Sequence, residues 1–393
     1  MGSDDPDPPR RPATRAIHPL RRASREFEAL ATPIYRGSTI LFDSLSDVVD
    51  RRRKPDHYRY GLTGTPTARE LALRIAALEG AHHTYLVPGG LAAISATYLA
   101  ICKAGSHVLL PASAYPPNRE LGEGLLSRLG IEVEQYDPLI GVGIADLIRP
   151  NTALIWCESP GSITMEIQDV PAIAAAAKVR GVPVGLDNTY AAGVLFDAFA
   201  AGVDISLQAL TKYVGGHSDV LLGSISVREA KLAQTIGTTL EQLGMGVSPD
   251  DCALALRGLA TLDLRLRALE QSTLEVAEWL RQRPEVQSLL HPAFPDCPGH
   301  EIWKRDFTGS ASLFSIIFRD RTPAHVERFV DSLKLFRIGF SWGGVTSLVM
   351  AYPHLKRPTS EDGPRLVRLN IGLEHPADLI ADLEQALTAA NRA

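Results

Sequence analysis

The stretch of sequence that decides the fold covers residues 182–219 and reads VPVGLDNTYAAGVLFDAFAAGVDISLQALTKYVGGHSD. It contains two short apolar segments, 182–186 and 205–209, and a polar turn follows each of them. Nearly continuous apolar segments of this length are typical of strands that are buried on both faces of a parallel sheet. We therefore expect two strands, one ending at Asp187 and one leading to Lys212. Open α/β sheets bind their ligands at such strand ends.

The same alternation of strands and helices extends toward the N-terminus. Apolar residues recur at helical spacing over 68–78 and 91–103, and a glycine closes each of these segments. Further helices are expected at 120–129 and 170–180. Short strand-like segments lie between these helices, at 84–87, 107–110, 132–136 and 153–157. The pattern predicts an α/β domain in which helices cover both faces of a mostly parallel sheet.

The pattern changes near residue 255. A long helix is expected over 256–283, because apolar residues recur there at spacings of three and four. After Pro284, strand-like and helical segments mix, which is typical of a smaller α+β domain. The expected organisation is an N-terminal tail and arm, a large domain and a small C-terminal domain, over residues 1–57, 58–255 and 256–393.

The composition limits the classes of protein to which the chain can belong. Its 393 residues are 45% hydrophobic and 22% charged, which fits two or three globular domains and excludes a disordered chain or a fibrous repeat. The net charge of −5 argues against nucleic acid as a partner, because nucleic-acid-binding proteins usually present a strongly basic face. The basic run at 51–54 is interpreted as a solvated helix end, with nucleic-acid binding as the alternative.

The expected compartment is the cytoplasm. The four cysteines are scattered and form no CxxC pair, which predicts reduced thiols rather than a disulfide framework or a zinc knuckle. The longest apolar stretch, 91–102, is shorter than the roughly 18 residues that a membrane span needs. The first residues lack the hydrophobic core of a secretory signal. His217 has no second ligand at metal spacing, so no metal is expected.

Three features of the sequence indicate how a ligand could bind. A glycine turn at Gly89-Gly90 joins a strand to a helix, and the free N–H groups at a helix start can bind a phosphate. Asp187 ends one strand, where a carboxylate must be paired with a cation or a polarised N–H. Lys212 follows another strand and precedes a glycine turn, a setting in which a lysine can become neutral and form a Schiff base.

Each of these features has an ordinary structural interpretation when it is taken alone. The glycines fit a simple tight turn, Asp187 fits a helix N-cap, and Lys212 fits a surface lysine that extends its ammonium into water. Together they fit pyridoxal phosphate, because the turn can hold the phosphate, the acid can pair with the pyridinium N–H, and the lysine can bond to the aldehyde. We therefore interpret the three features as one cofactor site.

A set of short motifs extends over roughly residues 32–390: Tyr60-Gly61 with Gly64-Thr65-Pro66-Thr67, Gly90-Leu91-Ala92-Ala93, Tyr115, Glu158-Ser159-Pro160-Gly161-Ser162, Asp187-Asn188-Thr189, Thr211-Lys212-Tyr213 with Gly216-His217-Ser218-Asp219, Ser341-Trp342-Gly343-Gly344, and Arg368 with Gly372-Leu373-Glu374. In these motifs the chain resembles the Cys/Met-metabolism family of fold-type I pyridoxal-phosphate enzymes, and within it the cystathionine β-lyases. The resemblance implies a mostly parallel, seven-stranded sheet domain with helices on both faces, plus a smaller α+β domain.

The resemblance also implies pyridoxal 5′-phosphate as the cofactor, and a role for ten residues. Lys212 would bind the cofactor covalently and carry protons, Asp187 would pair with the pyridine nitrogen, and Tyr115 would stack on the ring with its hydroxyl near the reacting atoms. The implied phosphate ligands are Gly90, Leu91 and Thr211, together with Tyr60 from a neighbouring subunit. The implied substrate-binding residues are Arg368, Ser341 and Trp342.

The activity that the resemblance implies is cleavage of L-cystathionine, or of a related cysteine thioether, to homocysteine, pyruvate and ammonia. Trp342 and Phe340 favour this β-lyase activity, because γ-acting relatives usually carry a smaller residue at the first position and several carry Glu at the second. Ala209 also suits the β-lyase branch. A γ-lyase, a γ-synthase or a lyase for another cysteine conjugate stays open, as does a non-catalytic protein on the same fold.

Two positions depart from the family pattern: Tyr190, where relatives often carry Trp, and Leu62, which stands at a phosphate-binding position. Members usually carry Tyr-x-Arg before the Gly-Thr-Pro-Thr segment, and both side chains bind the phosphate of the adjacent subunit. Here Tyr60 stands at the tyrosine position and Leu62 at the arginine position, so that Arg59 or another cation would have to substitute. Because Tyr60 would complete a neighbour's site, the resemblance implies at least a dimer, and commonly a homotetramer built as a dimer of dimers.

Overall fold

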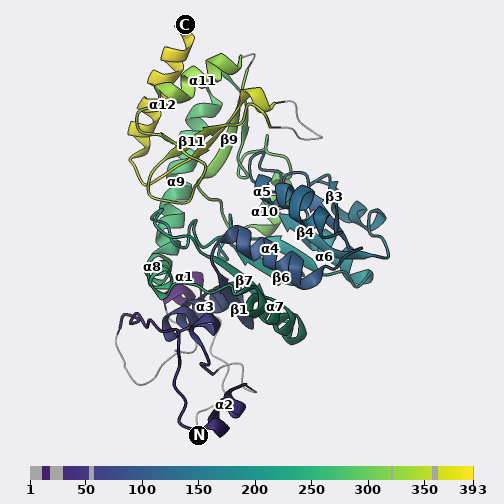
Figure 1. Ribbon diagram of the computed structural model, residues 1–393. Coiled ribbons are helices and arrows are strands. Elements are labelled where there is room, and N and C mark those ends of the chain that lie inside the picture. Colours follow the sequence, from purple (N-terminus) through teal and green to yellow (C-terminus); the bar gives the residue numbers. More distant parts are fainter. Residues whose placement is uncertain (1–10, 18–29, 53–56, 320–321, 356–361, 393) are drawn as a thin grey trace.

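The structure is a computed structural model that describes residues 11–17, 30–52, 57–319, 322–355 and 362–392. Within these residues the framework consists of a seven-stranded and a five-stranded sheet, and helix α9 (Leu262–Arg281) runs between the two regions (Figure 1). Most of the expected tail, at 1–10 and 18–29, lies outside the described residues, and so do Arg53 and Lys54 of the basic run.

The large sheet confirms the expected, mostly parallel arrangement. Its strands lie in the order β1-β7-β6-β5-β4-β2-β3, and neighbours are parallel except at β7, which is antiparallel to β1 and β6. The bounds are β1 His83–Val87, β2 His107–Pro111, β3 Glu132–Tyr136, β4 Thr152–Glu158, β5 Val184–Asp187, β6 Ile205–Gln208 and β7 Gly223–Val227. Strands β5 and β6 are the two that the segments 182–186 and 205–209 predict.

Helices cover both faces of the large sheet, because its strands send alternate side chains into two apolar clusters. Along β4, Leu154 and Trp156 belong to one cluster, and Ile155 and Cys157 belong to the other. The Trp156 face carries α4 (Gly90–Ile101), α5 (Pro116–Leu121), its π-helical continuation (Gly122–Leu126) and α7 (Ala230–Leu243). The Ile155 face carries α3 (Pro66–Glu79), α6 (Val170–Val179) and α8 (Pro249–Leu259).

The C-terminal region forms the expected α+β unit. Its strands lie in the order β10-β11-β12-β9-β8, and they are antiparallel except for the pair β10–β11. The bounds are β8 Val286–Leu290, β9 Leu313–Phe318, β10 Arg337–Ile338, β11 Leu348–Ala351 and β12 Leu366–Asn370. Helices α9, α11 (Pro323–Ser332) and α12 (Pro376–Asn391) share one apolar cluster with this sheet. The short helices are α10 (His300–Asp306) and the 3-10 turns Gly61–Thr63, Gly141–Asp146 and Gly363–Arg365.

The single long helix expected over 256–283 is wrong, because two helices, α8 and α9, meet at Ala260-Thr261. The guanidinium of Arg265 donates to the carbonyl of Gly258 at 2.7 Å and to Thr261 Oγ1 at 3.1 Å, so it occupies the acceptors at the end of α8. Residue 255 lies inside α8, which packs against α3. The domain boundary near this residue stays a prediction.

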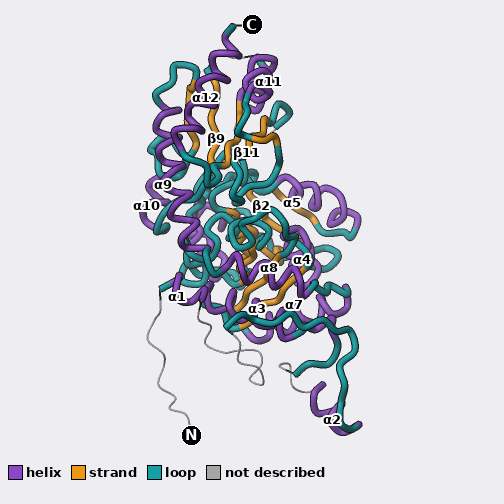
Figure 2. The backbone as a smooth tube through the Cα atoms, turned by 90° about the vertical axis from the view of Figure 1, so that its left-hand side faces the viewer, coloured by secondary structure: helices purple, strands orange, loops and turns teal. Residues whose placement is uncertain are grey.

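The described N-terminal segments contain two short helices that differ in their surroundings. Helix α1 (Pro12–Ile17) packs against α3 and α9. Helix α2 (Leu45–Arg52) lies apart from the body of the protein, as Figures 1 and 2 both show. Leu41 and Leu45 on this arm are 83% and 87% exposed. None of the described helices is long and apolar enough to cross a membrane.

Candidate active site

Residues from three neighbouring strands meet at the carboxyl edge of the large sheet. Glu158 ends β4 and lies beside Asp187, which ends β5, in the register of the sheet. The chain that leaves β6 places Lys212 near Asp187, close enough for the charge of each to shift the pKa of the other. The structure therefore brings together the strand-end acid and the lysine that the sequence indicates.

Asp187 is held by the turn that follows β5. Its Oδ1 accepts hydrogen bonds from the backbone N–H of Thr189 at 3.0 Å and from the Thr189 hydroxyl at 2.5 Å. Burial raises the pKa of Asp187, while the Thr189 bonds and the charge of Lys212 act in the opposite direction. Oδ2 receives no hydrogen bond from the residues that the structure describes. A partly buried carboxylate with one open oxygen fits a protonated ring nitrogen as its partner.

The side-chain amine of Lys212 is covered by Ser341 and Trp342. Its Nζ donates to Ser341 Oγ at 2.8 Å, and it lies 5.4 Å from the ring centre of Trp342. Burial and, to a smaller extent, the charge of Arg368 lower the pKa of Lys212 to about 8, a net value that includes the opposing effect of Asp187. A lysine with this pKa is neutral in about a tenth of the molecules one pH unit below the pKa, and a neutral amine can attack an aldehyde.

The glycine turn leads into α4 as expected, and it packs against the end of β6. The first backbone bond of the helix runs from Ala93 N to Gly89 O at 3.1 Å, so the N–H groups of Gly90 and Leu91 have no acceptor within the helix. A side chain at Gly90 would bring its Cβ within 2.7 Å of the Ala209 Cβ, so only glycine fits this contact. The open N–H groups suit a phosphate.

Thr211 is already engaged with the neighbouring chain segment. Its hydroxyl donates to the carbonyl of Leu222 at 3.2 Å and accepts from the N–H of Leu222 at 3.0 Å. The single hydroxyl proton is therefore used within the protein, and a phosphate would have to compete for it. The role of Thr211 in phosphate binding stays a prediction.

Arg368 reaches the site from the small sheet. It lies on β12, only 5% exposed, and donates to the carbonyls of Ser162 at 3.1 Å and Phe340 at 2.6 Å. Burial lowers its pKa, and Tyr352 and Tyr115 counteract this shift. The two carbonyls fix the plane of the guanidinium, which can form paired bonds to a carboxylate.

Tyr115 is the N-cap residue of α5 and lies directly before its first residue. The backbone N–H of Tyr115 donates to the carboxylate of Glu158 at 2.8 Å. Tyr115 is 39% exposed. Burial raises the pKa of Tyr115, and the negative charges of Asp187 and Glu158 raise it further. The sequence assigns no role to Glu158, although its place after the apolar strand 153–157 matches the place of Asp187 after β5.

Tyr60 does not join the other predicted site residues within the described chain. Its side chain is 53% exposed, and its backbone forms an isolated bridge with Thr39. The guanidinium of Arg59 pairs with Glu241 at 2.8 Å, so the cation nearest to Leu62 in the sequence is engaged within its own subunit. The phosphate-binding role of Tyr60 therefore stays a prediction about a second subunit.

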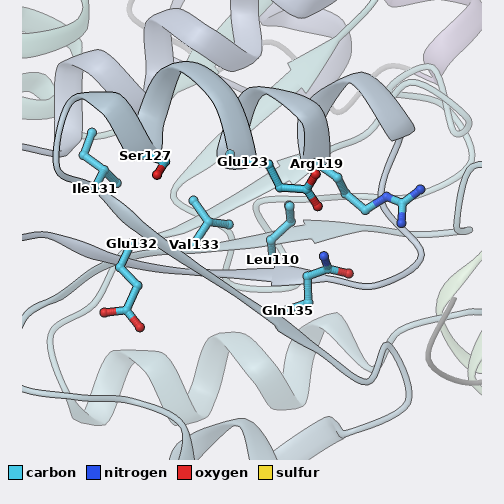
Figure 3. Close-up of a pocket in the computed structure, with 9 residues that line it drawn as sticks. Leu110, Arg119, Glu123, Ser127, Ile131, Glu132, Val133 and Gln135 are labelled. Carbon is cyan, nitrogen blue, oxygen red and sulfur yellow. The ribbon is translucent and has the colours of Figure 1, made fainter. Parts of the chain in front are cut away.

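Two other features of the structure lie away from this edge. A hollow of about 220 Å³ lies between the helical segment after Arg119 and strand β3, and none of the ten predicted site residues lines it (Figure 3). His107, Glu132 and Glu134 have a spacing that could suit a metal ion. The guanidinium of Arg149 bonds to both glutamates, at 2.8 Å for Glu132, and supplies the positive charge there.

Comparisons with known proteins agree with this geometry. The profile of the family described as "Cys/Met metabolism PLP-dependent enzyme" matches residues 13–388. A "Putative cystathionine beta-lyase" from Saccharomyces cerevisiae is 47% identical over 79% of this chain and 91% of that protein. A protein with the same description from Rhizobium johnstonii is 44% identical over 91% of each chain. The crystal structure of metB from Corynebacterium glutamicum has a TM-score of 0.90 and 30% identity, and covers 96% of this chain and 98% of that chain.

Proposed function

The chain belongs to the Cys/Met metabolism family of PLP-dependent enzymes, and on that premise we propose that it is a carbon–sulfur β-lyase. Its proposed reaction is the cleavage of L-cystathionine to homocysteine, pyruvate and ammonia. The observation that carries the proposal is the convergence of Lys212, Asp187 and Arg368 at one edge of the large sheet, where the charges of Asp187 and Arg368 both shift the pKa of Lys212.

The residues at this edge fit pyridoxal phosphate group by group. The open oxygen of Asp187 would accept the pyridinium N–H, and the N–H groups of Gly90 and Leu91 would hold the phosphate with help from Thr211. Tyr115 would lie over the ring, and Lys212 would bond to the aldehyde. When bound, the cofactor supplies an electron sink for the negative charge that develops at the substrate's Cα.

Lys212 has the properties of the proton carrier in this reaction. A free amine with a pKa of about 8 can take a proton from Cα near neutral pH and return it to the leaving sulfur. The raised pKa of Tyr115 keeps its hydroxyl protonated, so it is a second donor for that sulfur. The Cβ–S bond breaks with its electron pair on sulfur, and the three-carbon fragment hydrolyses to pyruvate and ammonia.

Arg368 would bind the α-carboxylate of the substrate. Its guanidinium is buried and already oriented by two backbone carbonyls, so little side-chain freedom is lost when a carboxylate binds. The hydroxyl of Ser341 and the ring of Trp342 would shape this pocket, since both contact the Lys212 amine.

Cleavage at Cβ rather than Cγ is supported by Phe340 and Trp342, the residues on either side of Ser341. Phe340 is apolar and 76% exposed, so its side chain offers no polar contact to the substrate, while its carbonyl holds Arg368. Trp342 fills space that a smaller residue would leave open. The alternative is a γ-lyase or γ-synthase of the same family, or a lyase for another cysteine conjugate.

We propose a homotetramer in the cytoplasm that acts in methionine biosynthesis through transsulfuration. Apolar side chains that a lone subunit exposes support the assembly: Leu41 and Leu45 on the arm, Leu221 (73%) and Phe340 (76%) on the body. In a dimer of dimers, Tyr60 would complete the phosphate site of a neighbouring subunit. Sedimentation of the purified protein should give four times the chain mass of 42.5 kDa.

The experiment that tests the proposed reaction measures both keto acids. Purified protein with pyridoxal phosphate is incubated with a panel of cysteine thioethers, including L-cystathionine, and pyruvate and 2-oxobutyrate are assayed separately. Pyruvate with homocysteine is the expected result. Formation of 2-oxobutyrate in place of pyruvate would move the enzyme to the γ-lyases, and pyruvate from another conjugate but not from cystathionine would change the substrate.

A further inference from the structure

Three buried polar side chains form a hydrogen-bonded series that begins at the residue after Lys212 and ends on the small sheet. They are Tyr213, Ser312 and Asn370, which are 1%, 0% and 1% exposed. The hydroxyls of Tyr213 and Ser312 lie 2.8 Å apart, and the Ser312 hydroxyl donates to Asn370 Oδ1 at 2.8 Å. Tyr213 belongs to the large region, whereas Asn370 ends strand β12. The three side chains therefore span the junction between the two regions.

The hydrogen bonds that join these three side chains can run in only one donor-to-acceptor order. Because the Ser312 hydroxyl proton goes to Asn370 Oδ1, the Tyr213 hydroxyl must donate to Ser312 Oγ. The Tyr213 oxygen in turn accepts from the backbone N–H of Ser312 at 3.0 Å. Each donor has one acceptor, so the loss of any member leaves a buried partner unsatisfied.

Asn370, the last of the three hydrogen-bonded side chains, holds the loop 341–344, which covers Lys212. Asn370 Oδ1 also accepts from the backbone N–H of Gly343 at 3.0 Å, and its amide donates to the carbonyl of Thr346 at 3.4 Å. Gly343 has a φ of +80°, and a Cβ there would lie 3.0 Å from Tyr213 N and 3.1 Å from the carbonyl carbon of Lys212. The loop backbone thus lies directly against the backbone of the lysine.

The side chains that this loop carries face the amine. Ser341 Oγ accepts from Lys212 Nζ at 2.8 Å, and the Trp342 ring centre lies 5.4 Å from the same nitrogen. Asn370 also follows Arg368 by two residues on β12, so both side chains lie on the same face of the small sheet. Asn370 therefore fixes the position of the loop 341–344, which covers Lys212, relative to the strand that carries Arg368.

We propose that Asn370 is a positioning residue, which acts through Gly343 to hold Ser341 and Trp342 against the Lys212 amine. This inference rests on the proposed role of Lys212. Loss of the Asn370 acceptor frees the loop and lets water reach the amine, while the charged groups that face Lys212, Asp187 and Arg368, keep their identity.

The test compares two variants with a matched control. Asn370→Leu removes the acceptor at similar volume, and Tyr213→Phe removes only a hydroxyl. The control is Tyr190→Phe, because Tyr190 is another buried tyrosine whose hydroxyl accepts from the backbone N–H of Ala311 at 3.0 Å, next to Ser312. The Tyr190 hydroxyl has no described bond to the 341–344 loop, so a purely structural effect would appear in the control as well.

Two readouts are measured on the full chain. The first is kcat and KM with the thioether substrate: Asn370→Leu should lower kcat about tenfold with KM changed less than about threefold, Tyr213→Phe should lower kcat by a smaller factor, and the control should stay within about twofold of wild type. The second is the pH dependence of the rate at which cofactor-free protein takes up pyridoxal phosphate covalently. Its midpoint, near 8 in the wild type, should move toward the ordinary lysine value of 10.5 in Asn370→Leu.

The outcomes separate this inference from the proposed function. If kcat and the uptake midpoint of Asn370→Leu and Tyr213→Phe match those of Tyr190→Phe, Asn370 has a structural role and the inference fails. If Asn370→Leu does not fold, Tyr213→Phe decides by the same two readouts. If Lys212→Ala takes up the cofactor covalently like the wild type, the proposed site itself is wrong.

Discussion

The lysine side and the arginine side of the candidate site are assembled over very different lengths of chain. Asp187 and the chain that leads to Lys212 come from the adjacent parallel strands β5 and β6. Arg368 and the loop with Ser341 come from the small sheet, and their bonds to the large region join residues 206 and 129 positions apart. The lysine side thus depends on local strand order, and the arginine side depends on how two sheets dock. Substitutions on the two sides should therefore fail in different ways.

The largest effect is expected on the lysine side. Lys212→Ala removes the proposed proton carrier and the amine proposed to bond to the cofactor, so kcat should fall about 10³-fold and the visible absorbance of the covalently bound cofactor should disappear. The exposed Lys178→Ala is the control and should behave as wild type. Persistence of the absorbance band in Lys212→Ala would assign the covalent bond to another residue.

A substitution on the arginine side should weaken substrate binding more than it slows the chemical step. Arg368→Lys keeps the charge but removes the paired donors, so KM should rise between about 10-fold and 100-fold, with a smaller change in kcat. Arg365→Lys is the matched control, because Arg365 ends the 3-10 turn just before β12, bonds to Asp362 and is not one of the predicted site residues. Equal KM values for Arg368→Lys and the control would remove Arg368 from the substrate site.

The pH dependence of kcat follows from the pKa of Lys212. Burial lowers this pKa to about 8, and the amine must be neutral to take a proton from Cα. The rate should therefore fall about tenfold per pH unit below that pKa and level off above it. A rate that stays constant from pH 8 down to pH 6 would show that Lys212 is not the base.

The smallest effect is expected at the departure from the family pattern. Leu62→Arg adds the cation that relatives carry, and a charge-assisted hydrogen bond to the phosphate should tighten cofactor binding about tenfold. The uncharged Leu62→Gln controls for length and polarity. The dissociation constant of the cofactor measured at two salt concentrations checks the prediction, and unchanged affinity in Leu62→Arg would count against the alignment of this segment.

The sequence predicts the lysine side because its signals are local. The apolar segments 182–186 and 205–209 point to β5 and β6 without any knowledge of the rest of the chain. The helix expected over 256–283 is wrong, and a tertiary contact lies at the break: the guanidinium of Arg265 donates to the carbonyl of Val214, 51 residues away, as well as to that of Gly258. Helical periodicity continues across such a break and cannot reveal it.

The arginine side lies largely beyond sequence reasoning for the same physical reason. The motif around Ser341 is readable through resemblance, but its contact with Lys212 depends on the docking of the small sheet. Tyr213 and Ser312 are 99 residues apart, and Ser312 and Asn370 are 58 residues apart, so no spacing rule pairs them. Glu158 gives one local signal, its place at the end of an apolar strand, and the bond to the Tyr115 backbone needs the fold.

The most direct test of the central claim is to find the lysine that bonds to the cofactor. The holoenzyme is treated with borohydride, which reduces the C=N bond and fixes the cofactor to its lysine, and the digested protein is mapped by mass spectrometry. The cofactor should be found on the peptide that contains Lys212. Modification of another lysine, with Lys212 unmodified, would contradict it.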